Sequence, residues 1–196
     1  MDEIKSPERR EKIERTLAHR QPMLSVVLEN IHDPHNVSAI LRSCDAVGIL
    51  QVHFLYTIEP FPEIANTASS GAHKWLEIIR HDSVQSCFGA LHSKSFRIFA
   101  TRIAPDATSL YELDLTQPTA FLLGNEHRGV SEEALALADE EIYIPMMGMA
   151  ESLNVSVAAA VCLFEAFRQR KEGAMYDTPQ LSPETLRSKR SEWLLK

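Results

Sequence analysis

Residues 24–56, LSVVLENIHDPHNVSAILRSCDAVGILQVHFLY, decide the fold class of this chain. The stretch opens with Leu24–Leu28, a short apolar run rich in β-branched residues that predicts a buried strand. A helix is expected next, capped by Asn36 and ended by Gly48, and Val52–Tyr56 predicts a second strand. The apolar positions of that helix keep a helical period: Val37, Ile40, Leu41, Cys44 and Val47.

The rest of the chain continues this alternation of strands and helices. Helices are expected at 7–20, 83–92 and 154–170, after Ser131 and from Pro183, and strands at 97–101, 120–123 and 142–144. Residues 57–74 contain several Pro, Ser and Asn residues and predict a long loop or a broken helix. Strands that alternate with helices predict an α/β domain with a mainly parallel sheet.

The composition indicates one globular domain. The 196 residues are 44% hydrophobic and 24% charged, which excludes a disordered or fibrous chain. No apolar run approaches the roughly 18–20 residues that span a bilayer, and the charged first residues lack the apolar core of a secretory signal. Three scattered cysteines are too few for a disulfide framework. We therefore expect a reduced, cytoplasmic protein.

The net charge of −7 argues at first against nucleic-acid binding, because phosphate binders usually carry a basic surplus. The distribution of charge weakens that objection. Six Lys and Arg residues lie between Lys5 and Arg20, interleaved with Glu, and a second basic group closes the helix expected at 154–170. Solvated helix faces and a local basic surface are both compatible with this pattern.

The glycine and histidine patterns exclude several common sites. No G-x-G-x-x-G occurs, which argues against a dinucleotide fold and the usual glycine-rich methyltransferase loop. Gly124 and Gly129 have the spacing of a P-loop, but Val130 stands where that loop needs lysine. His32 and His35 lack further well-spaced partners, so no metal site is expected.

Three polar segments occur in a fixed order: residues 36–43 (NVSAILRS), 123–131 (LGNEHRGVS) and 144–156 (IPMMGMAESLNVS). In order and spacing they resemble motifs 1, 2 and 3 of the SpoU/TrmH branch of the SPOUT RNA methyltransferases, and they span most of residues 24–170. The flanks at 20–22 (RQP) and 167–170 (FRQR) are most similar to branch members that methylate the ribose of guanosine 18 in the D loop of tRNA.

The resemblance implies a SPOUT fold whose C-terminal part forms a deep trefoil knot, a feature otherwise nearly absent from proteins. It implies a helical RNA-binding extension at 1–22, a methyltransferase domain at 23–170 and a helical extension at 171–196. It also implies a homodimer whose partner contributes to the active site, and S-adenosylmethionine as cofactor. The implied cofactor contacts, largely through backbone groups, are Thr101, Gly124, Ile144 and Leu153.

The resemblance also implies the catalytic residues: Asn36, Arg42, Glu126, Ser152 and Asn154. Arg42 matches the family's essential arginine. A guanidinium is a poor base in water, so either a substrate phosphate assists proton removal or Arg42 stabilises the developing alkoxide. Asn36 could cap its helix, orient Arg42 or orient the ribose. Glu126 could hold a loop or an arginine, or form a structural ion pair. Ser152 and Asn154 match a polar pair near the cofactor and the reacting ribose.

In this family context the arginines of the end helices become candidate phosphate contacts: Arg9, Arg10, Arg15, Arg20, Arg168 and Arg170. The short segment before the first strand favours tRNA over ribosomal RNA, whose methyltransferases commonly carry a separate RNA-binding domain. A non-catalytic RNA-binding relative is a further alternative, and the intact catalytic set counts against it. The helix at 154–170 is apolar over much of its surface, which predicts a homodimer that covers it.

Overall fold

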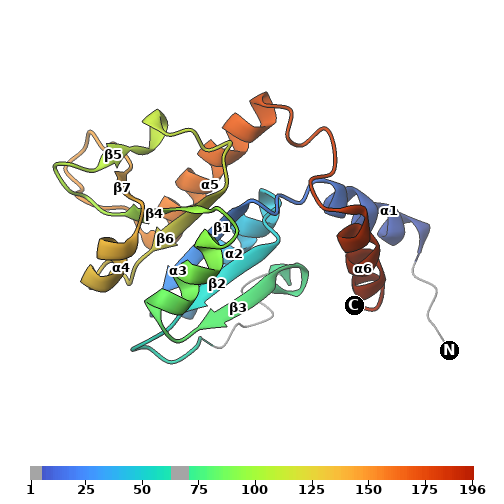
Figure 1. Ribbon diagram of the computed structural model, residues 1–196, viewed down its shortest axis with the longest axis horizontal. Helices are drawn as coiled ribbons and strands as arrows, with labels where there is room; N and C mark the ends of the chain where they lie inside the picture. Colours follow the sequence, from blue (N-terminus) through green and yellow to red (C-terminus); the bar gives the residue numbers. More distant parts are fainter. Residues whose placement is uncertain (1–5, 63–70) are drawn as a thin grey trace.

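A parallel sheet runs through the centre of the computed structural model, which describes residues 6–62 and 71–196 (Figure 1). The strands are β1 (Leu24–Glu29), β2 (Gln51–Leu55), β3 (Glu77–His81), β4 (Arg97–Thr101), β5 (Thr108–Ser109), β6 (Thr119–Leu123) and β7 (Glu140–Tyr143). They lie in the order β3-β2-β1-β6-β4-β7-β5, and every pairing between them is parallel. The predicted α/β fold with a parallel sheet is confirmed, and the trefoil knot stays a prediction of the family resemblance.

Helices cover both faces of the sheet and give it two apolar cores (Figure 1). They are α1 (Pro7–Ala18), α2 (Pro34–Ala46), α3 (Val84–His92), α4 (Glu132–Leu137), α5 (Val155–Glu172) and α6 (Pro183–Leu194), with short 3₁₀ turns η1 (Ala72–Trp75) and η2 (Leu110–Glu112). α2 and α5 pack on one face around Phe54 and Phe121. α3 and α4 pack on the other face around Leu122. No helix in the described ranges is both long enough and apolar enough to cross a membrane.

The first and last helices pack against each other beyond the end of the sheet (Figure 1). Ile13 and Leu17 of α1 and Trp193 of α6 form a small separate core. Tyr176 links this end to the sheet domain, because its hydroxyl donates to the carbonyl of Val47 at 2.7 Å. The two ends of the chain therefore build one surface. The boundaries expected after residues 22 and 170 stay predictions.

Two expectations about the elements were wrong. α2 begins at Pro34 rather than after Asn36, because Asp33 Oδ1 accepts from the backbone N–H of His35 at 2.8 Å and caps the helix there. β3 and β5 were not expected as strands. Of the long loop expected at 57–74, residues 63–70 lie outside the described residues, and η1 occupies its end. The expected end of α2 at Gly48 is confirmed by its positive φ of 87°.

Candidate active site

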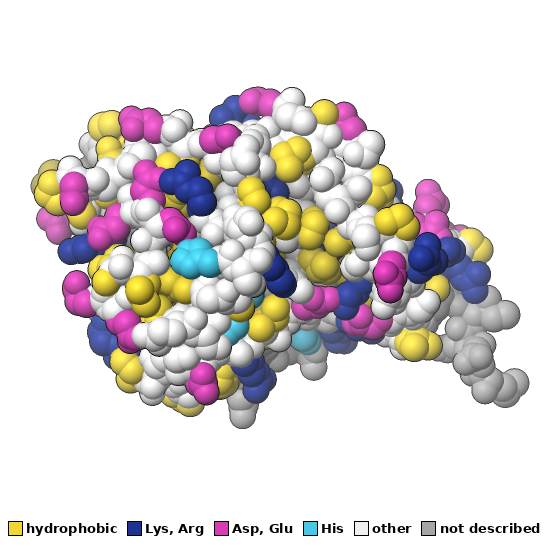
Figure 2. Space-filling view, viewed as in Figure 1, with side chains coloured by type: hydrophobic (Ala, Val, Ile, Leu, Met, Phe, Trp, Pro, Cys, Tyr) yellow, Lys and Arg dark blue, Asp and Glu magenta, His cyan; other side chains and the backbone are white. Residues whose placement is uncertain are grey.

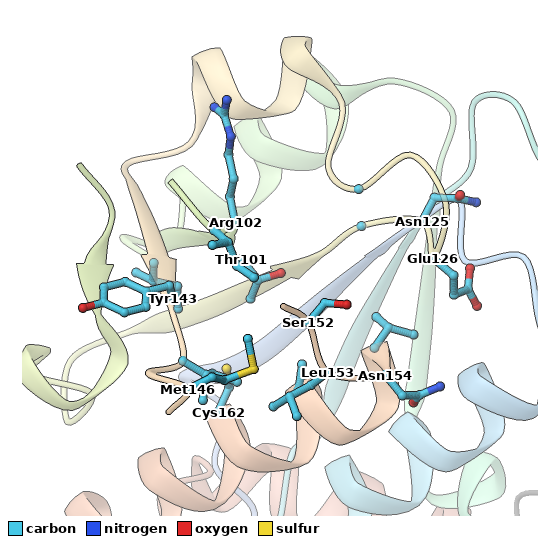
Figure 3. Close-up of a pocket in the computed structure, with 17 residues that line it drawn as sticks. Thr101, Arg102, Asn125, Glu126, Tyr143, Met146, Ser152, Leu153, Asn154 and Cys162 are labelled. Atoms are coloured by element: carbon cyan, nitrogen blue, oxygen red, sulfur yellow. The ribbon is translucent and has the colours of Figure 1, made fainter. Parts of the chain in front are cut away.

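The carboxyl ends of β4, β6 and β7 meet at one edge of the sheet, where three loops surround a cavity (Figure 3). The loops lie at 101–103, 124–129 and 144–154. The cavity has a volume of about 380 Å³, within the range of about 300–1,000 Å³ usual for small-molecule sites. Open α/β sheets bind ligands beyond the carboxyl ends of their strands. This cavity is therefore the candidate cofactor site.

Gly124 makes the closest backbone approach beside this cavity. A Cβ atom at residue 124 would lie 2.2 Å from the backbone carbon of Gly129 and 2.2 Å from the nitrogen of Val130. The loop is closed by Asn125 N–H donating to the Gly129 carbonyl at 3.0 Å, and by the reverse bond at 2.8 Å. Any side chain at residue 124 would push these strands of backbone apart. Glycine at residue 124 therefore lets the two sides of this loop lie against each other beside the cavity.

The side chain of Asn125 fixes this loop to the rest of the fold. It is 4% exposed, and its Nδ2 donates to the carbonyl of Asn30 at 2.7 Å. Its Oδ1 accepts from the backbone N–H groups of His127 and Arg128 at 3.0 and 3.1 Å. Asn125 was not among the residues expected at the site. An Asn that opens a turn closed by a glycine is the signal that identifies it.

All four residues expected to contact the cofactor line this cavity: Thr101, Gly124, Ile144 and Leu153. Thr101 Oγ1 donates to the carbonyl of Leu122 at 3.0 Å, so its hydroxyl is already engaged. Ile144, Leu153 and Met146 add apolar surface (Figure 3). Cys162 of α5 also lines the cavity, and burial raises the pKa of its thiol to about 12, which keeps it neutral. An apolar wall beside open backbone fits a cofactor with a flat base and a polar ribose.

Motifs 1, 2 and 3 are joined at the cavity by a chain of hydrogen bonds. Asn36 Nδ2 donates to Glu126 Oε1 at 2.9 Å, and Asn154 Nδ2 donates to Asn36 Oδ1 at 3.1 Å. Asn154 Oδ1 accepts from the backbone N–H of Ser156 at 2.8 Å and so caps α5. A carboxylate only accepts hydrogen bonds, so Glu126 fixes the orientation of both amides. Glu126 and Asn154 line the cavity, as does Ser152, which is exposed.

Glu126 is held as a carboxylate by three donors. Burial alone would raise its pKa, but the hydrogen bond from Asn36 and the backbone N–H groups of His32 and Asp33 lower the pKa below its usual value. The two backbone bonds measure 2.8 Å from His32 and 3.1 Å from Asp33. Of the roles considered for Glu126, the structure supports holding a loop: it ties motif 2 to the turn before α2.

Arg42 lies apart from this cavity. It is exposed on α2, six residues after Asn36, a separation that turns a helix by about 240° and advances it about 9 Å. Arg42 instead lines a second cavity of about 340 Å³ with Arg9, Lys12 and Trp75. Asn36 bonds to Glu126 and Asn154, so the expectation that it orients Arg42 is not met within one chain.

The chain is similar to known proteins over most of its length. Residues 23–164 match the model of the SpoU rRNA Methylase family. The chain belongs to the SpoU methylase family. The predicted family is thereby confirmed.

Three relatives of this SpoU methylase are similar over most of the chain. The tRNA (guanosine(18)-2′-O)-methyltransferase of Thermus thermophilus is 51% identical over 188 residues, covering 96% of each chain. The Escherichia coli protein of the same name is 43% identical over 87% of this chain and 74% of its own. The crystal structure of the A. aeolicus TrmH/SpoU tRNA modifying enzyme has a TM-score of 0.90 at 38% identity, covering 96% and 95%.

A more distant structure was solved with a cofactor. The SpoU methyltransferase AviRb from Streptomyces viridochromogenes, in complex with AdoMet, has a TM-score of 0.68 at 29% identity. The match covers 79% of this chain and 59% of AviRb.

Two of the arginines expected to contact RNA are interior residues of the methylase, and that expectation was wrong for them. Arg20 and Arg170 are each 0% exposed. Arg20 donates to the carbonyl of Ile49 at 2.6 Å and pairs with Asp45 at 2.5 Å. Arg170 donates to three backbone carbonyls and one glutamine. Both guanidinium groups donate hydrogen bonds to backbone carbonyls inside the fold and therefore cannot reach a phosphate.

The other expected RNA contacts of the methylase differ in their surroundings. Arg10 and Arg15 are exposed on α1, and Arg9 is partly exposed beside Trp75, with its guanidinium carbon 5.9 Å from that ring. Arg168 is exposed but pairs with Glu165 and Glu172 on its own helix, each at 2.7 Å. Lys and Arg side chains are interspersed with Asp and Glu near the end helices (Figure 2). The free basic surface of α1 is therefore local.

Proposed function

We propose that this methylase transfers the methyl group of S-adenosylmethionine to the ribose 2′-hydroxyl of guanosine 18 in tRNA. The observation that carries the proposal is the cavity at the carboxyl ends of β4, β6 and β7, lined by residues of motifs 2 and 3. Support also comes from the names of the Thermus thermophilus and Escherichia coli relatives, which match 96% and 87% of this chain.

The cavity residues fit the cofactor. Thr101, Gly124, Ile144 and Leu153 would hold it, with Gly124 keeping the loop at 124–129 closed beside it. S-adenosylmethionine supplies a methyl group already activated on a sulfonium, so transfer needs a hydroxyl in line with that methyl group and a route for its proton. The remaining tasks, orientation and charge stabilisation, belong to the protein.

Orientation falls to the hydrogen-bonded amides at the mouth of the cavity. Asn154 is fixed by Asn36 and Ser156, and Asn36 is fixed by Glu126. A preorganised polar group loses little freedom when substrate arrives, which favours the reactive alignment. The exposed hydroxyl of Ser152 lies on the same rim and is available to the ribose.

Arg42 is the residue that stabilises the charge developing on the ribose oxygen, and its position points to a dimer. Arg42 lies outside the cavity of its own chain, and α5 carries an apolar stripe along one side, on which Val157 and Phe164 are exposed and Val161 is partly buried. Val157 and Phe164 are 48% and 50% exposed. Residues at this helical spacing share a face, and a second copy would cover it in a two-fold interface. We propose that Arg42 of one protomer serves the cavity of its partner.

Mixed dimers test this arrangement. Arg42→Ala and Asn154→Ala should each abolish methyl transfer and leave the dimer intact. If Arg42 acts across the interface, mixing the two variants restores activity to about a quarter, because half of the dimers then hold one site with neither defect. Mixing that restores nothing would place both residues in one chain's site and contradict the shared site.

A transfer assay separates the candidate functions. The methylase is incubated with labelled S-adenosylmethionine and either a tRNA transcript or a ribosomal RNA fragment, and the products are digested to nucleosides. The proposal expects 2′-O-methylguanosine from tRNA alone. Label in ribosomal RNA alone would support the alternative substrate, and binding of tRNA without any transfer would support a non-catalytic protein. Transfer should also fall in Arg42→Ala through kcat, with cofactor affinity retained.

A further inference from the structure

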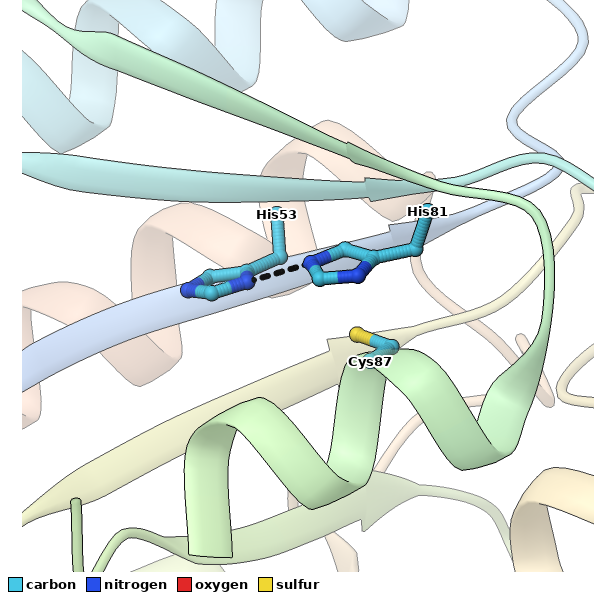
Figure 4. A group of neighbouring side chains, drawn as sticks. All are labelled: His53, His81 and Cys87. Atoms are coloured by element: carbon cyan, nitrogen blue, oxygen red, sulfur yellow. Dashed lines mark hydrogen bonds between the residues drawn. The ribbon is translucent and has the colours of Figure 1, made fainter. Parts of the chain in front are cut away.

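Three side chains of the kind that bind metals meet in the core on the α3 side of the sheet (Figure 4). His53 comes from β2, His81 from the end of β3 and Cys87 from α3. The ring nitrogens His53 Nδ1 and His81 Nε2 lie 2.9 Å apart, and the three ligating atoms all lie within 4.8 Å of one another. The side chains are nearly enclosed, at 3%, 7% and 0% exposure.

The sheet register creates this cluster. In the parallel pairing of β2 and β3, His53 is opposite Ile79 and Leu55 is opposite His81. The two histidines therefore occupy diagonal positions on the same face of the sheet, since side chains alternate between faces. α3 packs on that face and brings Cys87 beneath them (Figure 4). None of the three residues lines the cofactor cavity.

The surroundings of the cluster are apolar, which makes the cluster unusual. Cys87 packs in a core with Val27, Leu55 and Phe88. Buried polar groups in such a core normally form hydrogen bonds or serve a function. The hydrogen bond between His53 Nδ1 and His81 Nε2 needs one nitrogen to accept, so at least one of the two imidazoles is neutral. Neutral imidazole is the form that coordinates metals.

We propose that His53, His81 and Cys87 bind a zinc-type divalent ion. Two imidazole nitrogens and a thiolate are ligands that zinc prefers. With Zn–N bonds of about 2.0–2.1 Å in a tetrahedral site, the nitrogens would be about 3.3 Å apart. The histidine pair therefore needs to open only slightly, and the ion takes the place of the proton that the two nitrogens share. This departs from the sequence-based expectation of no metal.

Binding of the ion releases one proton, from the thiol of Cys87. The Cys87 S–H bond breaks as the metal–sulfur bond forms, and that proton passes to solvent. The imidazole that donates the shared proton loses it to solvent and takes up one proton from solvent at its other ring nitrogen, so that it stays neutral. Each imidazole then has one N–H, on Nε2 of His53 and on Nδ1 of His81, where Ser86 Oγ lies 3.4 Å away as an acceptor. Such outer partners orient metal-bound histidines.

Cobalt(II) serves as a spectroscopic probe of this site in the full-length protein. We expect about one cobalt per chain, a thiolate-to-cobalt charge-transfer band, and displacement of that band by zinc. Cys87→Ser should abolish the band. The matched control Cys44→Ala removes another buried cysteine, far from both histidines in the fold, and should keep it. A His32→Ala, His35→Ala double variant should also keep it.

X-ray absorption of the zinc-loaded wild-type protein makes the test independent of how the variants fold. The expected spectrum shows one sulfur and at least two imidazole ligands. A wild-type protein that develops no charge-transfer band, a zinc shell without sulfur, or a band that survives in Cys87→Ser would overturn the site.

Discussion

The environment of Arg170 predicts that its removal destabilises the fold strongly. The residue is 0% exposed on α5. Its Nε donates to the carbonyl of Leu115 at 2.9 Å, and its Nη2 to the carbonyls of Met23 and Gln117 at 2.8 and 2.7 Å. Its Nη1 donates to Gln21 Oε1 at 3.3 Å. One guanidinium thus joins α5 to the chain segments before β1 and before β6.

The magnitude follows from the acceptors left behind. In Arg170→Ala, three buried carbonyls lose this donor, and an unsatisfied buried acceptor costs about 1–3 kcal/mol. Water that enters the vacated space satisfies part of them, so we expect the free energy of unfolding to fall by about 3–5 kcal/mol. Such a loss is a large share of the roughly 5–15 kcal/mol that stabilises a typical domain.

Urea unfolding followed by circular dichroism measures this effect, with Arg168→Ala as the matched control. Arg168 is two residues away on the same helix, exposed, and paired only with Glu165 and Glu172. Exposed ion pairs contribute little to stability, so the midpoint of Arg168→Ala should stay close to that of the wild type. Equal midpoints for Arg170→Ala and the wild type would refute the structural role of Arg170.

Three further perturbations have defined outcomes. Gly124→Ala should abolish cofactor binding measured by calorimetry, because its Cβ meets backbone at 2.2 Å, whereas Gly89→Ala, which meets nothing within 4 Å, should bind normally. The fold lowers the pKa of Glu126, so the ionised carboxylate stabilises the protein above its ordinary pKa, and this stabilisation is lost as the pH falls through the lowered pKa. Thermal melts of Glu126→Gln should lack this loss of stability in acid. A melting temperature that depends on acid pH in the same way in the variant and the wild type would contradict this role. Arg10→Ala and Arg15→Ala should each weaken tRNA binding and reduce the log–log salt slope by about 0.7–0.9, and an unchanged slope would show that α1 is only a solvated face.

The fold class was predictable from sequence because its central strands carry strong local signals. β1 and β2 are short apolar runs separated by an amphipathic helix, and their pairing matches the prediction. β3 was missed because the charged residues Glu77 and Arg80 leave it without a continuous apolar run. It forms a strand because it pairs with β2 at the edge of the sheet. β5 has only two residues, too few to show the alternating pattern of a strand in the sequence, and it forms because it pairs with β7.

The residues of the candidate site were likewise predictable only in part. Motifs 2 and 3 predicted residues that line one cavity, since each of them follows a strand whose carboxyl end lies at the same edge of the sheet. The depth of a charged side chain is not encoded locally. Arg170 and its partner Gln21 are 149 residues apart in sequence, so their contact appears only in the fold. The cluster of His53, His81 and Cys87 likewise depends on the register of β2 and β3, and β3 was not predicted.

The most direct test of methyl transfer to the ribose uses a tRNA with one oxygen removed. A transcript assembled with 2′-deoxyguanosine at position 18 is compared with the all-ribose transcript, using labelled S-adenosylmethionine and this methylase. We expect the all-ribose tRNA to accept about one methyl group per molecule and to yield 2′-O-methylguanosine, while the deoxy tRNA binds but stays at background. Equal labelling of both transcripts would contradict transfer to the 2′-hydroxyl of guanosine 18.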